Sequence, residues 1–155
     1  MLIETPQKTT FAAVRVARLH VVTPRDKIQQ AMQQAIHEVT TLLREQRVTP
    51  AGPWFAHHHH KPTGTFDFDV CFPVSQPIAP AGRVESRDIP ATEVLRTVYR
   101  GPYDKLHLAW PEFVEWIETN GYKTREDAFE VYSVGPREEP DPANWQTEMN
   151  YPLAQ

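Results

Sequence analysis

The stretch WQTEMNYPL at residues 145–153 repeats a pattern that the chain already shows as FDFDVCFPV at residues 66–74. Aromatic residues lie near both ends of each stretch, a proline follows at the same place, and Asp69 falls on Glu148. Because side chains alternate between the two faces of a strand, each stretch is expected to form a strand with unlike faces. The repetition predicts that one structural module occurs twice in the fold.

The segments around these two strands follow one order in both halves. In the first half, the patterns predict a strand at 9–19, an amphipathic helix at 25–47, and strands at 54–60 and 66–72 joined by a turn at 61–64. In the second half, they predict a strand at 91–99, a helix at 103–120, and strands at 128–134 and 145–153. Pro111 inside the second helix predicts a kink there or a division into two short helices.

The repeated order predicts the fold class. We expect an α+β fold in a single domain over residues 1–155, made of a duplicated β-α-β-β module with pseudo-two-fold symmetry. Repeat one is placed at 1–76 and repeat two at 82–155. Alignment of FAHHHHKP with FEVYSVGP places His58 on Tyr132, so the halves offer the same positions with different chemistry.

Composition excludes several classes of protein. Sixteen basic and twenty acidic side chains, without a basic run, leave a formal net charge of −4, so no direct nucleic-acid partner is expected. No apolar stretch is long enough for a signal or membrane helix, and the single cysteine has no partner for an internal disulfide. We therefore expect a soluble, cytoplasmic protein without a membrane partner. Motifs of phosphate-binding loops, dinucleotide sites, nucleophile elbows and thiol redox sites are absent.

Glu148 is the candidate functional residue of the last strand. If the apolar residues of the strands pack on the helices, alternation places Glu148 on the helix-free face of the sheet. The same face is then expected to contain Glu130 and the residues matched in the alignment of the repeats, namely Tyr132, Asp69 and His58. A carboxylate among aromatic rings attracts a cation, and each ring adds about 0.5 to 2 kcal/mol. The alternative is that Glu148 is an ordinary solvated strand residue, and spacing alone leaves both interpretations open.

Four consecutive histidines at 57–60 raise the question of a metal site, because histidines two apart on a strand can share one ion. Further ligands are not evident, since His20, His37 and His107 are scattered along the chain. No metal site and no cofactor are therefore predicted. An exposed edge strand is the alternative to a ligand-binding role for His58.

Three stretches resemble a known family. VYRGPY at 98–103, FEVY at 129–132 and WQTEMNYPL at 145–153, with the duplicated β-α-β-β order, resemble the GyrI-like small-molecule-binding domains. That family includes the effector-binding domains of AraC-type and MerR-type regulators. No helix-turn-helix segment is found beside the matching region, so the chain is expected to be a stand-alone member.

The resemblance implies an antiparallel arrangement of about eight strands, with two main helices on one side and a ligand cleft on the other. In such families a glutamate of the last strand lies at the bottom of the cleft, and Glu148 is the matching residue. Five further residues are expected to bind the ligand with it: Tyr132, Trp110, Tyr103, His58 and Asp69.

Three functions are open at this point. The first hypothesis, which we prefer, is a binding protein that takes amphipathic, cationic or aromatic compounds such as drugs or toxins, without turnover. The second is a hydrolase of cyclopropane-bearing toxins, in which Glu148 activates a water and Tyr132 holds the electrophile. The third is a modulator that binds DNA gyrase through the acidic loop at 137–141. A monomer and a dimer fit each hypothesis equally.

Overall fold

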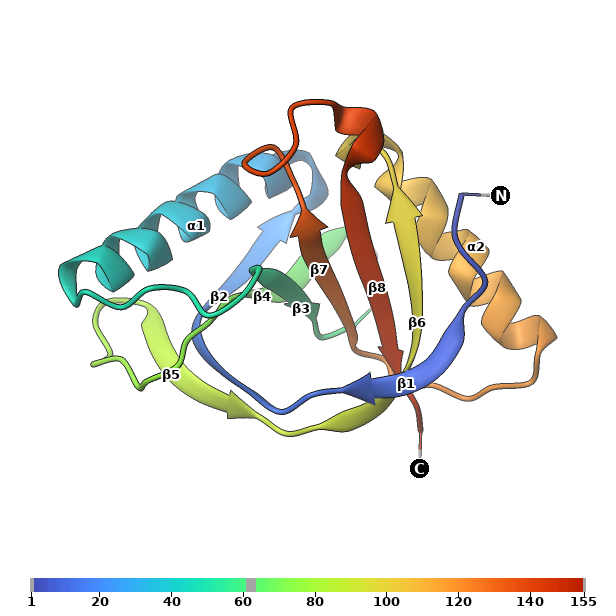
Figure 1. Cartoon of the computed structure of the whole chain (residues 1–155), viewed down its shortest axis with the longest axis horizontal. Helices are drawn as coiled ribbons and strands as arrows, with labels where there is room; N and C mark the ends of the chain where they lie inside the picture. The colour runs from blue at the N-terminus through green and yellow to red at the C-terminus, as the bar shows by residue number, and fades with distance from the viewer. Residues whose placement is uncertain (1, 61–63, 155) are drawn as a thin grey trace. The chain divides into compact units, whose positions relative to one another are not determined.

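The computed structural model describes residues 2–60 and 64–154, which contain eight strands and two α-helices (Figure 1). They form two compact units: residues 1–11 with 92–155 make unit 1, and residues 12–91 make unit 2. Each unit has four strands and one helix, and both have the same strand order. The predicted α+β class and duplicated β-α-β-β order are confirmed. The predicted turn at 61–64 lies outside the described residues, except for Gly64.

Unit 2 has the strand order β3-β4-β2-β5, and each of these pairings is antiparallel. Its elements, in chain order, are β2 (Val14–Pro24), the 3-10 turn η1 (Arg25–Lys27), α1 (Ile28–Glu45), β3 (Phe55–His58), β4 (Thr65–Pro73) and β5 (Val84–Ile89). Helix α1 lies against β2 and β4. The residues of these strands that face it are buried, among them Leu19, Val21, Phe68 and Val70.

Unit 1 has the strand order β1-β6-β8-β7, again antiparallel. Its elements are β1 (Gln7–Phe11), β6 (Thr92–Arg100), η2 (Tyr103–Lys105), α2 (Leu106–Thr119), β7 (Ala128–Val134), η3 (Pro142–Asn144) and β8 (Gln146–Pro152). Helix α2 continues through Pro111 as a single helix, so of the two predicted alternatives, a kink or two short helices, the second does not occur. Pro111 stands in the second turn, where it removes only the hydrogen bond to the carbonyl of His107.

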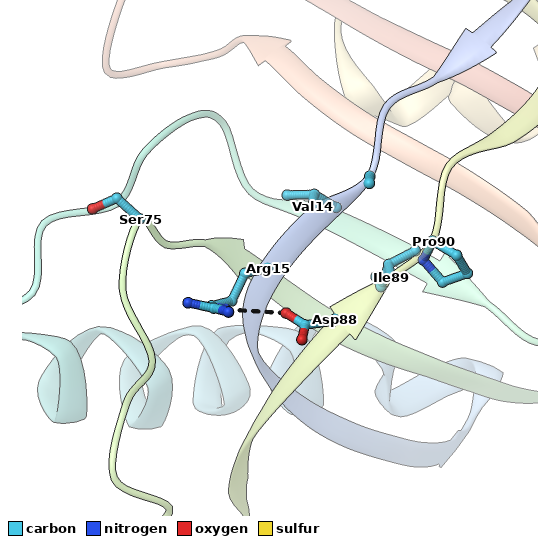
Figure 2. A pocket seen from close by; sticks show the side chains of 7 residues that line it. Val14, Arg15, Ser75, Asp88, Ile89 and Pro90 are labelled. Carbon is cyan, nitrogen blue, oxygen red and sulfur yellow. Dashed lines mark hydrogen bonds and ion pairs between the residues drawn. The ribbon is translucent and has the colours of Figure 1, made fainter.

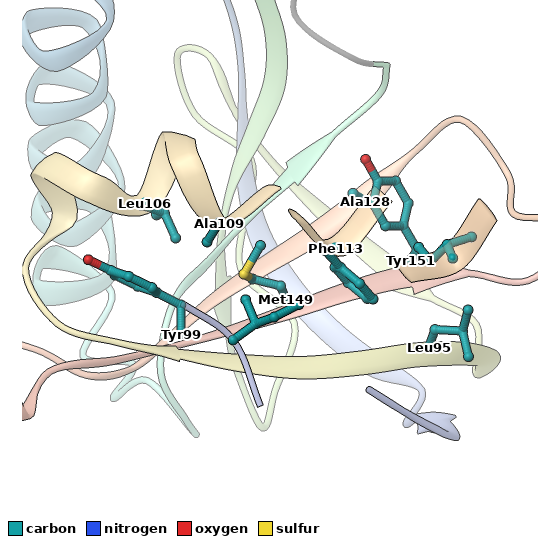
Figure 3. Close-up of a cluster of buried hydrophobic side chains, with 10 residues drawn as sticks. Leu95, Tyr99, Leu106, Ala109, Phe113, Ala128, Met149 and Tyr151 are labelled. Atoms are coloured by element: carbon teal, nitrogen blue, oxygen red, sulfur yellow. The ribbon is translucent and has the colours of Figure 1, made fainter. Parts of the chain in front are cut away.

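The core of unit 1 lies between α2 and one face of its strands (Figure 3). Leu106, Ala109 and Phe113 of the helix pack there with strand residues such as Met149 and Tyr151. This face of β6 and β8 therefore faces the helix, and the alternate residues face away from it. None of the helices in the described ranges is long and apolar enough to cross a membrane.

The predicted first strand at 9–19 is wrong, because the chain forms two strands there. β1 pairs with β6 in unit 1, whereas β2 pairs with β4 and β5 in unit 2. Phe11, the last residue of β1, stacks its ring on that of Phe129 in the same unit, with centroids 4.2 Å apart, and this contact helps to hold β1 in unit 1. β5 lies in repeat two, where no strand was predicted at its position, and it joins unit 2. Each compact unit thus contains one strand from the other sequence repeat.

Both helices end in the same type of hydrogen-bonded turn. After α1, the amide of Val48 donates to the carbonyl of Leu43 at 2.9 Å, around Arg47 with a φ of 59°. After α2, the equivalent bond spans 3.1 Å around Gly121, whose φ is 75°. The left-handed conformation suits glycine, so Gly121 is a favourable helix terminator and Arg47 is an unusual one.

Candidate functional site

A buried glutamate of β7 is the centre of a polar and aromatic cluster in unit 1. Glu130 is 7% exposed, and the indole N–H of Trp110 donates to one of its carboxylate oxygens at 2.6 Å. The hydroxyl of Tyr132 donates a short hydrogen bond to the other oxygen. Both donors are neutral, and the ion pairs found among the described residues do not include Glu130. Within the described part of the chain, its charge is therefore solvated by dipoles and not compensated by a cation.

Strand register explains why these side chains meet. Glu130 pairs directly with Met149, which lies in the core under α2, so Glu130 faces the helix. Tyr132, two residues further along the strand, packs against the same core. Trp110 contributes from α2, where its ring meets that of Tyr151 edge-on at 5.3 Å. The helix and two strands together hold the carboxylate and its donors in place.

Two more aromatic rings extend the cluster towards solvent. Tyr103 of η2 lies edge-on to Tyr132, with ring centroids 5.8 Å apart, and its ring is 4.8 Å from that of Trp145. The indole N–H of Trp145 donates to the carbonyl of Glu139 at 2.8 Å, which fixes this ring. Tyr103 is 36% exposed and forms the solvent side of the cluster.

The electrostatics of the cluster keep its phenols protonated. Burial raises the pKa of Tyr132 well above its ordinary value, and the charge of Glu130 raises it further. Burial also raises the pKa of Tyr103, with a smaller contribution from the charges of Glu138 and Glu130. Both hydroxyls are therefore neutral donors at neutral pH. The arrangement can attract a cation to one carboxylate and hold it against aromatic faces.

Glu148 lies on the opposite face of these strands. It pairs with Val98 and Val131, and its Oε1 is 3.1 Å from Nε of Arg96. Its side chain is 26% exposed, so it is partly solvated and its charge is neutralised by Arg96. The expectation that Glu148 shares a face with Tyr132 is wrong.

The cause of this error lies in β7, which has apolar residues on both faces. Phe129 and Val131 were expected to face the helix, but Met149 pairs with Glu130 and with neither of them. Phe129 stacks on Phe11 instead. Alternation divides a strand into two faces, but it does not tell which face is covered by the helix when both are apolar.

The last two predicted site residues belong to unit 2 and lie on different faces of it. His58 pairs with Phe68, and their rings are 5.4 Å apart on the buried face. Asp69 points to the other face, where its Oδ2 accepts a hydrogen bond from Arg18 at 2.9 Å. The expected helix-free placement is therefore confirmed for Asp69 and wrong for His58.

The structure thus brings together three predicted residues, Tyr132, Trp110 and Tyr103, and adds two that the sequence did not assign to a site. These are Glu130 and Trp145. The spacing in FEVY was a usable signal for Glu130, because residues two apart on a strand share a face and Tyr132 was already a candidate. Trp145 gave no comparable signal, since it precedes β8 and its role depends on the loop before it.

A surface hollow of about 390 Å³ lies elsewhere, in unit 2 (Figure 2). It is lined by four apolar residues and three polar or charged ones: Ala13, Val14, Ile89 and Pro90 with Arg15, Ser75 and Asp88. Nε of Arg15 is 3.0 Å from Oδ1 of Asp88, so these charges neutralise each other. The hollow contains none of the predicted site residues.

Comparison with known families gives one match over almost the whole chain. The model of the GyrI-like small molecule binding domain matches residues 4–154. No curated protein sequence matches the chain.

Several solved structures share the fold. The EcmrR C-terminal domain matches with a TM-score of 0.88 and 22% identity, over 100% of this chain and 99% of that domain. In the EcmrR–DNA complex, the TM-score is 0.87 and the identity 22%, over 100% of this chain, which spans only 59% of the EcmrR chain.

Two more distant structures carry chemical information in their descriptions. SAV2435 bound to tetraphenylphosphonium has a TM-score of 0.68 and 12% identity, over 97% of this chain and 94% of that one. A hydrolase encoded by lin2189 from Listeria innocua has a TM-score of 0.64 and 14% identity, over 96% of this chain and 91% of that one. At these identities the likeness shows the fold alone.

Proposed function

Because the chain belongs to the GyrI-like family of small-molecule-binding domains, we propose that it binds aromatic cations at Glu130. The observation that carries the proposal is the buried carboxylate of Glu130, which has two neutral hydrogen-bond donors and lies beside aromatic rings. Glu148, the glutamate expected from the sequence, is already paired with Arg96 and is replaced by Glu130 in this proposal.

Physical chemistry favours a cation as the ligand. A buried carboxylate has lost most of its hydration, and two neutral donors replace only a part of it. A ligand cation restores the missing charge compensation in a medium where Coulomb attraction is stronger than in water. The faces of Tyr132, Tyr103 and Trp145 add about 0.5 to 2 kcal/mol each when a cation lies over them. The aromatic part of the ligand gains further from burial against the same rings.

The position of Tyr103 favours entry from the side of η2. Tyr103 is the more exposed ring of the pair that it forms with Tyr132, and it belongs to a short 3-10 turn ahead of α2. Rotation of this one side chain would remove its contact with the ring of Tyr132, whose hydroxyl donates to Glu130. A relative of similar fold has been solved with tetraphenylphosphonium, an aromatic cation, which supports the ligand class.

The test is a titration with tetraphenylphosphonium, followed by quenching of tryptophan fluorescence and by calorimetry. Glu130→Gln keeps the size of the side chain and removes its charge, and Glu148→Gln is the matched control on the opposite face. We expect Glu130→Gln to abolish or strongly weaken binding and Glu148→Gln to leave it within about twofold. Equal affinities of the native protein and Glu130→Gln, or loss of binding in Glu148→Gln alone, would contradict the proposal. Circular dichroism establishes that both variants are folded.

A hydrolase is the second candidate, favoured by the hydrogen bond from Tyr132 to Glu130 and by a neighbour described as a hydrolase. Glu130 would take a proton from water, whose oxygen would attack a cyclopropane carbon. The electron pair of the broken ring bond would stay on the toxin, which would then take the proton back from Glu130. Incubation with a cyclopropane-bearing electrophile, followed by mass spectrometry, tests this. A product heavier by one water with the native protein, and not with Glu130→Gln, supports hydrolysis; recovery of unchanged compound supports binding alone.

A gyrase partner stays a prediction. The carboxylates of the loop at 137–141 accept hydrogen bonds from backbone amides of the same segment: Glu138 from Gly135, Glu139 from Asp141, and Asp141 from Ala143. Their first structural role is to fold the loop that holds Trp145.

A further inference from the structure

A row of polar side chains crosses three neighbouring strands on the helix-free face of unit 2. His20 of β2 and His57 of β3 both pair with Asp69 of β4, so the three residues lie side by side. His59 follows His57 by two residues and contacts the same carboxylate, with its Nε2 3.0 Å from Oδ2 of Asp69. One ligand atom each of His20, His59 and Asp69 lie within 4.8 Å of one another.

Asp69 is the least accessible member of this row and the one that needs an explanation. It is 1% exposed. Its Oδ2 has two partners, Arg18 and His59, but among the described residues its Oδ1 has no hydrogen-bond partner. Buried polar atoms are almost always satisfied, and an unsatisfied carboxylate oxygen is costly. A cation held by both oxygens of this carboxylate would satisfy Oδ1.

We infer that His20, His59 and Asp69 form a binding site for a divalent first-row metal ion such as zinc. Two imidazole nitrogens and one carboxylate oxygen are a donor set that zinc, cobalt and nickel accept. This inference goes beyond the proposed binding of aromatic cations, because it uses other residues in the other unit. The sequence did not reveal it, since His20 is distant along the chain and meets His59 only through the pairing of β2 with β4.

The distances between the three ligand atoms are compatible with a zinc site after a small movement of one side chain. Ligand atoms at about 2.0 to 2.2 Å from zinc lie roughly 3.3 Å apart in a tetrahedral arrangement. The contact from His59 to Asp69, at 3.0 Å, is already close to that value. His20 is the ligand that must move; 52% of its side chain is exposed, so the rotation is opposed mainly by the contact of its Nε2 with Asp67. Three protein ligands leave a coordination position for water or for an added ligand.

The surroundings of the three ligands also favour a cation. Asp67 lies beside His20, with Oδ1 2.6 Å from its Nε2, and can orient that ring as an outer partner. Arg18 is close to Asp69, but it is shared with Glu85 at 3.6 Å. Glu85 also pairs with Arg87 at 3.0 Å, so two guanidiniums lie among the three carboxylates of Asp67, Asp69 and Glu85, and the local charge stays negative while the imidazoles are neutral.

The experiment must distinguish metal binding at this site from nonspecific metal binding by the four adjacent histidines at 57–60. The native protein is titrated with Zn²⁺ by calorimetry and with Co²⁺ by visible absorption, which reports the coordination geometry directly. His20→Gln and His59→Gln remove ligands. His58→Gln is the matched control, because His58 belongs to the same run of histidines but lies on the opposite face beside Phe68. His37→Gln, on the exposed side of α1, is a distant control.

We expect one metal ion per chain. Loss of an outer partner alone costs about 10- to 100-fold in metal affinity, so loss of His20 or His59 is expected to cost at least ~10-fold. His58→Gln and His37→Gln should bind like the native protein. Absence of binding, an affinity of His20→Gln equal to that of the native protein, or an equal loss in His58→Gln would each overturn the inference.

A loss of metal binding in these variants can be distinguished from a loss of folding. His20 is half exposed, so His20→Gln is expected to fold normally, whereas Asp69→Asn changes a buried, ion-paired group and is used only if circular dichroism shows it folded. The titration contains no aromatic cation, and Glu130→Gln should bind the metal normally. Failure of the metal site and failure of the proposed ligand site are therefore separate results.

Discussion

The indole N–H of Trp110 donates a hydrogen bond to the carboxylate of Glu130 across 2.6 Å, and this bond joins α2 to β7. It ties the helix to a strand through a charged acceptor that is 7% exposed. Hydrogen bonds to charged groups are stronger than those between neutral groups, and a buried acceptor that loses its donor is costly. The contact therefore contributes to stability as well as to the candidate site.

Trp110→Phe removes this donor and keeps most of the aromatic packing. We expect the free energy of unfolding to fall by about 1 to 3 kcal/mol, because one oxygen of Glu130 is left without a partner. Urea denaturation followed by circular dichroism measures the change. Trp116→Phe is the control, since Trp116 is a partly buried ring stacked on Tyr122, and it should change the stability less. Equal losses in the two variants would show that packing, and not the hydrogen bond, is responsible.

The buried tyrosines predict a loss of stability at alkaline pH. Burial raises the pKa of Tyr151 to about 12. Because the raised pKa belongs to the folded state, its stabilising contribution is complete below about pH 10 and is lost as the pH rises towards about 12. The loss for this residue is up to roughly 2 to 3 kcal/mol. Urea denaturation between about pH 9 and pH 11 should show a decline that is shallower in Tyr151→Phe; parallel curves would contradict the assignment.

The duplication was predictable because it rests on local patterns. The alignment of the repeats is confirmed by strand pairs, since Phe55 pairs with Cys71 as Phe129 pairs with Asn150. The alignment of Asp69 with Glu148 has a structural counterpart as well. Arg18 pairs with Asp69 at 2.9 Å and Arg96 with Glu148 at 3.1 Å, from the neighbouring strand in each unit.

The faces of the strands and the meeting of distant strands were not predictable in the same way. Glu130 and Phe129 lie on opposite faces of β7. Helix α2 packs on the face of Glu130, and Phe11 of β1 packs against Phe129 on the other face. No local sequence pattern indicates which helix or strand packs on which face. His20 could not be assigned to a site from the sequence, because nothing near it indicates that β2 lies beside β4. Both candidate sites depend on such long-range pairings, and this is why the sequence predicted the fold better than the sites.

The end of α1 offers a stability prediction with an internal control. Arg47 has a φ of 59°, a conformation that costs a residue with a side chain about 1 to 2 kcal/mol relative to glycine. Arg47→Gly should stabilise the protein by about 0.5 to 1 kcal/mol, because the greater freedom of glycine in the unfolded chain offsets a part of the gain. Gly121→Ala, at the equivalent place after α2 with a φ of 75°, should destabilise it. Thermal unfolding measures the change in stability of each variant. A change of the same sign in Arg47→Gly and Gly121→Ala would contradict the argument.

Gly135 offers a test of the part that Tyr103 plays in the proposed ligand site. A Cβ atom at Gly135 would lie 2.8 Å from the hydroxyl of Tyr103, closer than such contacts allow. The phenol is the far end of a flexible side chain, so Gly135→Ala should displace Tyr103 and change the stability little. Because Tyr103 is on the exposed side of the cluster, loss of the contact between its ring and the ligand would cost about 0.5 to 1 kcal/mol, the lower part of the range for such contacts, or about 2- to 5-fold in affinity for tetraphenylphosphonium. Gly52→Ala is the control, since a Cβ there makes an ordinary contact at 4.0 Å. Unchanged affinity in Gly135→Ala would remove Tyr103 from the site and leave Glu130 with Tyr132 and Trp145 alone.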